Sequence, residues 1–314
     1  MVVGQEKLPA VLVPYRGPQS DPEIEDIFVY MRPETNGVLG ESTILRVIER
    51  CPQYRVEIEL VYLANIPGQF ILENHIVERH YAPKLHFAVL GKRACTPNIR
   101  RRFSEQFGVS FDDAPVIGSF EALRVLKLRP EELFDTWVDP SDMLIVSGQS
   151  IKRIDGYYVL NYDLPALLHK NSKNTDIAVM VFRIRTGYPY FADLVERMRQ
   201  GLIAEGLLNP AMHSGRAFHY SKSPFEQILD GMGYLYASGG EPVPLEDISF
   251  ARYLLQRGVG VNQIIGALRN PVALFAAEDG TLIEESLINY TFHDSYTEAM
   301  RKFHRMVAQY LTDR

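Results

Sequence analysis

The chain has 314 residues, of which 46% are hydrophobic and 23% are charged, so it can bury a sizeable core in one large domain or two small ones. Its formal net charge of −6 excludes a global basic field, and nucleic acid is therefore not an expected partner. The apolar runs are much shorter than the roughly 20 residues that cross a bilayer, and the two cysteines are too few for a disulfide framework. We expect a cytoplasmic protein with no membrane contact.

The first predicted elements form a β-α-β unit after a loose N-terminal arm at residues 1–25. The apolar run at 27–31 and the alternating pattern at 56–62 predict strands, and helical spacing between them predicts a helix over 41–50. Next along the chain we expect a helix over 70–81, a strand over 116–120, and a short helix over 131–137 with Trp137 turned inward.

The second half of the chain predicts a hairpin followed by helices. Residues 157–162 and 177–184 are rich in Val, Ile and Tyr and flank a polar turn, which favours two paired strands. Residues 191–202 predict an amphipathic helix. The remaining expected elements are helices over 246–257, 261–269 and 295–311.

The segment from Val29 to Glu41 reads Val-Tyr-Met-Arg-Pro-Glu-Thr-Asn-Gly-Val-Leu-Gly-Glu. It resembles the first strand and turn of nucleoside diphosphate kinases, in which Lys-Pro-(Asp/Glu)-Gly precedes a Gly-Glu helix start, and Arg32 replaces the lysine. His80-Tyr81, followed by Lys84 and Phe87, resembles the family's next helix. The resemblance implies that Arg32 contacts phosphate and that Tyr81 and Phe87 help to form the nucleotide site.

Further matches follow in the same order along the chain. The segment from Ala114 to Leu123 resembles the family's third strand. Thr136 falls at the spacing of a phosphate-contacting Thr, and Arg129 lies one position from a phosphate-binding Arg. The resemblance therefore implies that Arg129 and Thr136 stabilise the transferred phosphate.

Residues 215–223 read Gly-Arg-Ala-Phe-His-Tyr-Ser-Lys-Ser and resemble the His-Gly-Ser-Asp-Ser segment whose histidine carries the phosphate. The resemblance implies that His219 is the carrier, that Ser221 belongs to the catalytic site, and that Asp230 takes the place of a glutamate that orients the ring. A neutral imidazole can attack a γ-phosphoryl group while a carboxylate on its other nitrogen fixes the tautomer.

Other interpretations of these residues remain open. Ser223-Pro224-Phe225-Glu226 is a helix start by itself, with Ser as N-cap, Pro at the first position and Glu completing a capping box. His169 is a second possible phosphate carrier, closer along the chain to Thr136. The histidines at 75, 80 and 86 lack the spacing of metal ligands on one helix face, so no protein-held metal is expected.

Together these observations predict an α/β protein with a ferredoxin-like antiparallel sheet covered by helices over residues 26–236. Insertions are expected near 88–113 and 144–213, and a helical extension over 237–314, which could carry a homo-oligomer or another protein partner. The implied function is a nucleoside diphosphate kinase-like transferase that moves a γ-phosphoryl group through a phosphohistidine, with ATP or another nucleoside triphosphate and its Mg²⁺. The alternatives are a catalytically inactive nucleotide-sensing or protein-interaction module of the same fold, and an unrelated α/β protein with chance matches.

Overall fold

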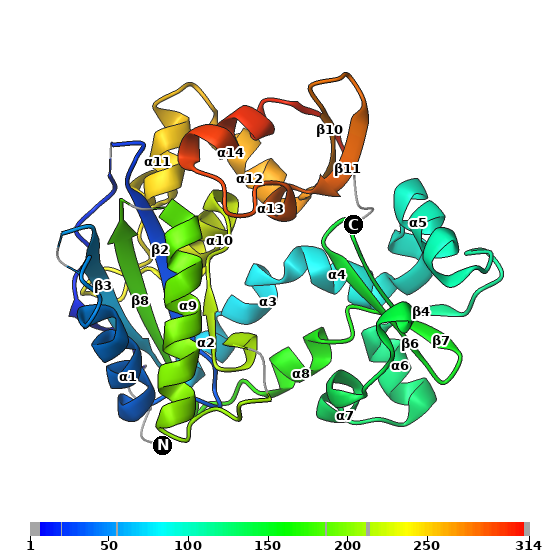
Figure 1. Ribbon diagram of the computed structural model, residues 1–314, viewed down its shortest axis with the longest axis horizontal. Coiled ribbons are helices and arrows are strands. Elements are labelled where there is room, and N and C mark those ends of the chain that lie inside the picture. Colours follow the sequence, from blue (N-terminus) through cyan, green and yellow to red (C-terminus); the bar gives the residue numbers. More distant parts are fainter. Residues whose placement is uncertain (1–6, 20, 55, 186, 212–213, 311–314) are drawn as a thin grey trace, which may run out of the picture. The chain divides into compact units, whose positions relative to one another are not determined.

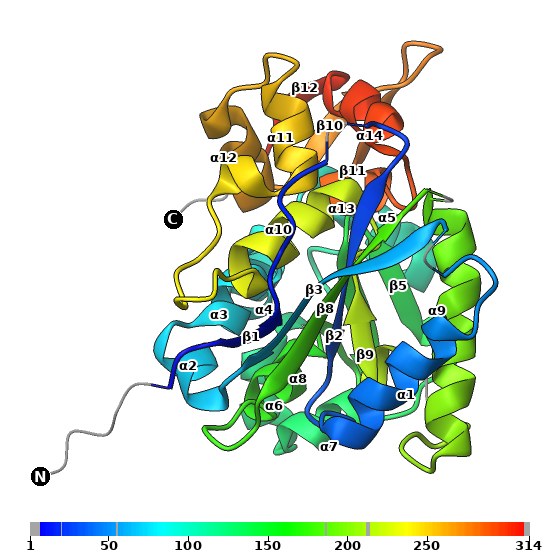
Figure 2. The same cartoon turned by 90° about the vertical axis from the view of Figure 1, so that its left-hand side faces the viewer.

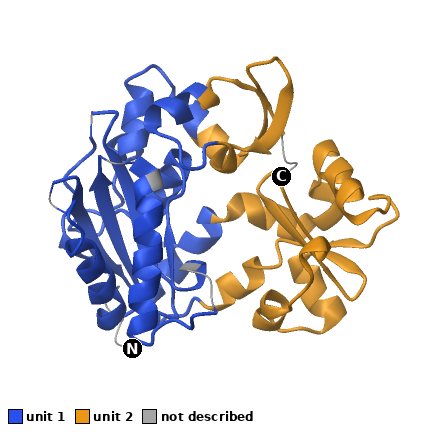
Figure 3. Ribbon diagram, in the orientation of Figure 1, with its two compact units in different colours: residues 1–80, 171–264, 291–301 blue, residues 81–170, 265–290, 302–314 orange. Residues whose placement is uncertain are grey.

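The chain folds into two compact units, each assembled from separate segments of the sequence (Figure 3). The computed structural model describes residues 7–19, 21–54, 56–185, 187–211 and 214–310. Unit 1 comprises residues 1–80, 171–264 and 291–301, and unit 2 comprises residues 81–170, 265–290 and 302–314. Parts of the predicted arm (1–6 and 20), of the predicted 144–213 insertion (186 and 212–213) and of the predicted extension (311–314) lie outside the described residues.

A five-stranded antiparallel sheet forms the centre of unit 1 (Figure 1). Its order is β1-β3-β8-β2-β9. The bounds are β1 (Ala10–Val13), β2 (Glu25–Met31), β3 (Ile58–Ile66), β8 (Ile177–Ile184) and β9 (Phe218–Tyr220). Strand β8 reads Ile-Ala-Val-Met-Val-Phe-Arg-Ile, and this nearly continuous apolar run suits a central strand that is covered on both faces.

Helices cover both faces of this sheet, as Figure 2 shows for α1 and α9 on one face and α10 on the other. The first face holds a core in which Ile44 of α1 and Phe191 of α9 pack with Val29 and Met180 from the sheet. Because strand side chains alternate, the other residues of β2 and β9 point toward α10. The helices of unit 1 are α1 (Val38–Glu49), α2 (Gly68–Glu73), α3 (Ile76–His80), α9 (Gly187–Ala204), α10 (Pro224–Tyr234) and α11 (Ser249–Leu255), with 3₁₀ turns η3 (Ser214–Arg216) and η4 (Leu245–Asp247).

The segment before β2 is held to unit 1 by a buried polar network. The Tyr15 hydroxyl donates to Asp26 Oδ2 over 2.7 Å, and the Arg183 guanidinium binds both oxygens of the same carboxylate over 2.7 and 3.0 Å. Ser249 adds a further hydrogen bond of 2.6 Å to Asp26. The described part of the predicted loose arm is therefore anchored, because it supplies edge strand β1 and the tyrosine that helps to satisfy a buried carboxylate.

Unit 2 contains two smaller sheets. One has the order β4-β7-β6-β5, in which β4 and β7 are parallel, and the other is the antiparallel sheet β11-β10-β12. The strands are β4 (Val116–Gly118), β5 (Met143–Val146), β6 (Gln149–Ile154), β7 (Tyr157–Leu160), β10 (Val272–Ala276), β11 (Leu282–Ser286) and β12 (Met306–Gln309). Its helices are α4 (Ala82–Leu90), α5 (Pro97–Phe107), α6 (Ser119–Leu126), α7 (Pro130–Asp135), α8 (Leu164–His169) and α13 (Leu287–Tyr290), with η1 (Gly91–Ala94) and η2 (Pro140–Asp142); α12 (Val261–Arg269) and α14 (Tyr296–Phe303) include residues of both units.

The predicted α/β class with an antiparallel sheet is confirmed, as is the initial β-α-β unit. The hairpin predicted for 157–162 and 177–184 is wrong, because β7 and β8 pair within different sheets. Strand β8 and helix α9 are integral to unit 1, although the sequence assigned them to an insertion over 144–213. Periodicity identified these strands but could not tell which strand each one pairs with.

Three further expectations need correction. The helix predicted over 70–81 breaks into α2 and α3 at Asn74 and His75, whose φ is +49°. The segment 237–314 is not a purely helical extension, since it contributes all three strands of the sheet β11-β10-β12. Trp137 is 82% exposed rather than inward, because α7 ends at Asp135 and the tryptophan lies beyond its packed face.

No helix in the described part of the chain has the length and apolar character needed to cross a membrane.

Candidate functional site

His219 lies in the middle of β9 and faces the α10 side of the sheet in unit 1. It is paired with Tyr30 of β2, so the two side chains project from directly opposite positions of an antiparallel pair. The imidazole stacks on the Tyr30 ring with a centroid distance of 4.5 Å and an interplanar angle of 24°. His219 is 8% exposed. The histidine is thus a covered side chain held flat against a buried tyrosine.

Helix α10 brings two carboxylates to this imidazole. Ser223 is the N-cap, and its hydroxyl oxygen accepts a hydrogen bond of 3.1 Å from the backbone N–H of Glu226. Glu226 and Asp230 are four residues apart, so they lie on the same face of the helix. The cap therefore fixes the start of the helix such that both acids face β9.

Both carboxylates lie near the same ring nitrogen of His219. Its Nε2 is 3.4 Å from Asp230 Oδ2 and 3.7 Å from Glu226 Oε1. These distances exceed the roughly 2.7–3.2 Å of a hydrogen bond, a feature common in ligand-free catalytic sites. Two acids on Nε2 favour the tautomer that carries the proton there, which leaves the lone pair on Nδ1.

Asp230 is fully buried and interacts with a second histidine, His80, at the end of α3. Asp230 Oδ1 is 3.7 Å from His80 Nδ1, while Oδ2 accepts a hydrogen bond of 2.7 Å from the Ser221 hydroxyl. Ser221 follows His219 by two residues in the same extended segment, so both side chains point toward α10. One carboxylate thus bridges two imidazoles, and we call His80, His219, Ser221, Glu226 and Asp230 the His219 cluster.

Burial dominates the electrostatics of the His219 cluster. It raises the pKa of Asp230 to about 6, and the nearby His80, the Ser221 hydrogen bond and the Arg32 charge oppose this shift. Burial also lowers the pKa of His80 to about 4, against the attraction of the Asp230 carboxylate. Near pH 7 the cluster therefore holds an ionised Asp230 beside a neutral His80.

Arg32 follows β2 and supplies a positive charge to the same region. Its guanidinium carbon lies 5.7 Å from the centre of the Tyr30 ring, on which His219 stacks. Its backbone N–H donates to the Ala217 carbonyl over 2.8 Å, and the Thr35 hydroxyl donates to that carbonyl as well. The turn after β2 is therefore tied to the residue that precedes β9. Gly40 is needed for this turn, since a Cβ there would lie 2.2 Å from the Thr35 carbonyl oxygen.

The structure thus brings together four of the predicted site residues within unit 1, namely His219, Asp230, Ser221 and Arg32. The other four, Tyr81, Phe87, Arg129 and Thr136, belong to unit 2.

Within that unit Arg129 forms an exposed ion pair with Glu132, and Thr136 donates to the Glu132 carbonyl. Phe87 is a core residue beside Cys95 and Ile99, and the Tyr81 carbonyl accepts the first helical hydrogen bond of α4. The alternative carrier His169 also belongs to unit 2, where its Nδ1 lies 2.7 Å from Glu131 Oε1 on an exposed surface.

Sequence reasoning did not assign His80, Tyr30 or Glu226 to the site. Sequence spacing could have identified two of them: Tyr30 is two residues before Arg32, and Glu226 is one helical turn before Asp230. His80 joins through tertiary packing alone. Within the described ranges, no group of three or more His, Cys, Asp or Glu side chains is arranged to hold a metal ion.

Comparisons with known proteins provide no relative for this chain: no family model, no curated protein and no solved structure matches it. The function must therefore be argued from the site itself.

Proposed function

We propose that unit 1 is a phosphoryl-transfer module of the nucleoside diphosphate kinase kind, in which Nδ1 of His219 carries the phosphate. One observation carries the proposal. Asp230, which is ionised near pH 7, and a second acid, Glu226, both lie near Nε2 of His219 on strand β9. That arrangement directs the nucleophilic lone pair to Nδ1 and stabilises the positive charge that the ring gains on phosphorylation.

The order of elements supports a ferredoxin-like core. Strands and helices β2-α1-β3-β8-α9-β9 follow the β-α-β-β-α-β order, and the spatial order β3-β8-β2-β9 is that of a ferredoxin-like antiparallel sheet. In this assignment the family's third strand corresponds to Ile177–Ile184 instead of 116–120, and residues 81–170 form one insertion after His80. The separate insertion expected near 144–213 is then unnecessary.

The proposed reaction has two half-reactions. Nδ1 of His219 attacks the γ-phosphorus of a nucleoside triphosphate, the bond to the β-γ bridging oxygen breaks, and the diphosphate leaves with that oxygen. A terminal oxygen of a second nucleoside diphosphate then takes the phosphoryl group, and the N–P bond breaks. Asp230 keeps the Nε2 proton in place through both steps.

Arg32 is the proposed phosphate ligand of unit 1. Its guanidinium can bind two phosphate oxygens at once, unlike a lysine ammonium. Mg²⁺ would enter as part of the nucleotide substrate, held mainly by phosphate oxygens and water. The chain's own task is to position the imidazole and balance charge.

The test is incubation with γ-labelled ATP and Mg²⁺, followed by a search for acid-labile, base-stable phosphate on the protein. We expect label that disappears in His219→Ala, persists in the matched control His169→Ala, and moves to added GDP. Stable labelling of His219→Ala would contradict the assignment.

A second function is favoured by one specific observation, the cover over His219. Tyr30 stacks on the imidazole and the side chain is 8% exposed, so the same module could bind nucleotide without transferring phosphate. In that case equilibrium dialysis would show nucleotide binding that Arg32→Gln weakens, with no phosphate on His219. Absence of both binding and label would exclude both functions.

A further inference from the structure

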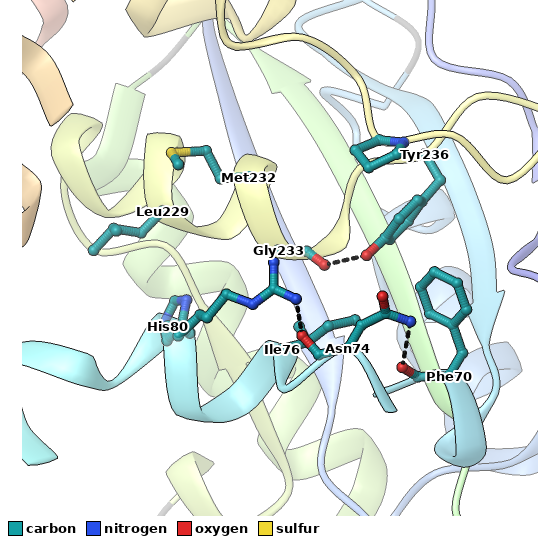
Figure 4. A pocket seen from close by; sticks show the side chains of 10 residues that line it. Phe70, Asn74, Ile76, His80, Leu229, Met232, Gly233 and Tyr236 are labelled. Atoms are coloured by element: carbon teal, nitrogen blue, oxygen red, sulfur yellow. Dashed lines mark hydrogen bonds between the residues drawn. The ribbon is translucent and has the colours of Figure 1, made fainter. Parts of the chain in front are cut away.

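Unit 1 contains a cavity of about 160 Å³, and His80 is one of the residues that line it (Figure 4). It lies between α2 and α3 on one side and α10 with the following segment on the other. Phe70 and Ile76 form one wall, and Leu229 and Met232 form the other. A cavity of about 150 Å³ accommodates a benzene ring, so this one has room for a small ring or a branched aliphatic group.

The polar groups of this cavity are few and carry positive charge or hydrogen-bond donors. Arg79 lines it, and among the described residues its guanidinium makes one hydrogen bond, to the Asn74 carbonyl, and no ion pair with a carboxylate. Most of its five N–H donors therefore remain for a ligand. The Tyr236 hydroxyl lies in the same lining and donates to the Gly233 carbonyl over 2.9 Å.

From these features we infer that the cavity binds a small monocarboxylate with an aromatic or branched apolar body. The body would pack between Phe70, Leu229 and Met232, and the carboxylate would pair with the Arg79 guanidinium. An arginine without an acidic partner beside an apolar wall suits this amphipathic anion, because the charge is satisfied at the rim while the body is removed from water.

His80 gives the cavity a connection to the His219 cluster. It lines the cavity and its Nδ1 lies 3.7 Å from Asp230 Oδ1. Because the His80 ring lines the cavity, an occupant that packs against it changes the environment of the imidazole, and its C–H resonances therefore report occupancy. The site is independent of the proposed phosphoryl transfer, and none of its tests needs a nucleotide.

The experiment is a titration with benzoate, and with benzyl alcohol as an uncharged probe of nearly the same shape. Calorimetry measures the affinity, and the imidazole C–H resonances of His80, assigned with His80→Gln, report the location. We expect saturable benzoate binding with a Kd of about 1 mM or below and roughly tenfold weaker binding of benzyl alcohol. The His80 resonance should shift during the benzoate titration.

Two variants and a control separate the cavity from a surface effect. Arg79→Gln should weaken benzoate about five- to tenfold and leave benzyl alcohol unchanged, whereas Arg46→Gln, on an exposed face of α1, should change neither. Met232→Trp, at a residue 45% exposed, should fill the cavity and abolish both binding events while the thermal midpoint is retained. The inference is overturned if benzoate gives no saturable shift at His80, if both arginine variants act equally, or if Met232→Trp binds as the natural protein does.

Discussion

The buried pair of His80 and Asp230 predicts that two single substitutions change the pH dependence of stability in opposite directions. The pKa of Asp230 is raised from 3.8 to about 6, and that of His80 is lowered from 6.5 to about 4. Between about pH 4 and pH 6 the native protein holds one proton on Asp230 and none on His80, while the unfolded chain holds one proton on His80 and none on Asp230. Both states bind the same number of protons, so the pair adds almost no slope to the free energy of unfolding.

Each substitution removes one of the two titrating groups, so that the proton uptake of the native and unfolded states no longer cancels. In Asp230→Asn only His80 titrates, the unfolded state binds more protons, and the free energy of unfolding rises by about 1.4 kcal/mol per pH unit toward pH 6. In His80→Gln only Asp230 titrates, the native state binds more protons, and the free energy falls with pH at a similar rate. Between about pH 4.5 and 6 the two variants should diverge by roughly 4 kcal/mol.

Urea unfolding followed by far-UV circular dichroism, repeated across this pH range, measures these slopes. Slopes of the same sign in the two variants, or slopes equal to that of the natural protein, would refute the reasoning.

Three further predictions concern unit 1. Arg183→Met breaks the buried bidentate ion pair with Asp26 and should lower the free energy of unfolding by about 3 kcal/mol. Arg16→Met, in an exposed ion pair with Glu59, should lower it by less than about 1 kcal/mol. Urea midpoints measure both losses, and equal losses would contradict the argument. Ser223→Ala removes the α10 cap and should cost about 1 kcal/mol in the same assay, against a few tenths for Ser223→Gly. Tyr30→Leu uncovers the imidazole and should raise the rate of His219 acylation by diethylpyrocarbonate, read by peptide mass spectrometry, by about tenfold or more; an unchanged rate would show that the stacked ring does not shield it.

Local patterns predicted the parts of the site that depend on short sequence spacing. Serine and glutamate around Pro224 identified the start of α10. The resemblance to the family's histidine segment singled out His219, Ser221 and Asp230, and strand alternation and helical spacing in the structure explain why their side chains face one another. These residues do converge, because each relation spans fewer than a dozen residues.

The pairing of strands could not be predicted in the same way. Residues 116–120 and 177–184 are both apolar and β-branched, so both suit the third strand of the expected sheet, and only tertiary pairing distinguishes them. Residues 272–276 and 282–286 were missed although Asp279-Gly280 between them is a hairpin signal, because the surrounding helical periodicity dominated the interpretation. His80 reaches Asp230 across 150 residues of sequence, and no local pattern encodes such a contact.

The most direct test of the central claim is to determine which ring nitrogen of His219 carries phosphate. After incubation with ATP and Mg²⁺, heteronuclear ³¹P–¹H correlation on protein selectively labelled at histidine distinguishes Nδ1-phosphohistidine from Nε2-phosphohistidine. Because Asp230 and Glu226 both face Nε2, we predict phosphate on Nδ1 of His219. Phosphate on Nε2, or on another residue while His219 stays unmodified, would contradict the proposed orientation of the site.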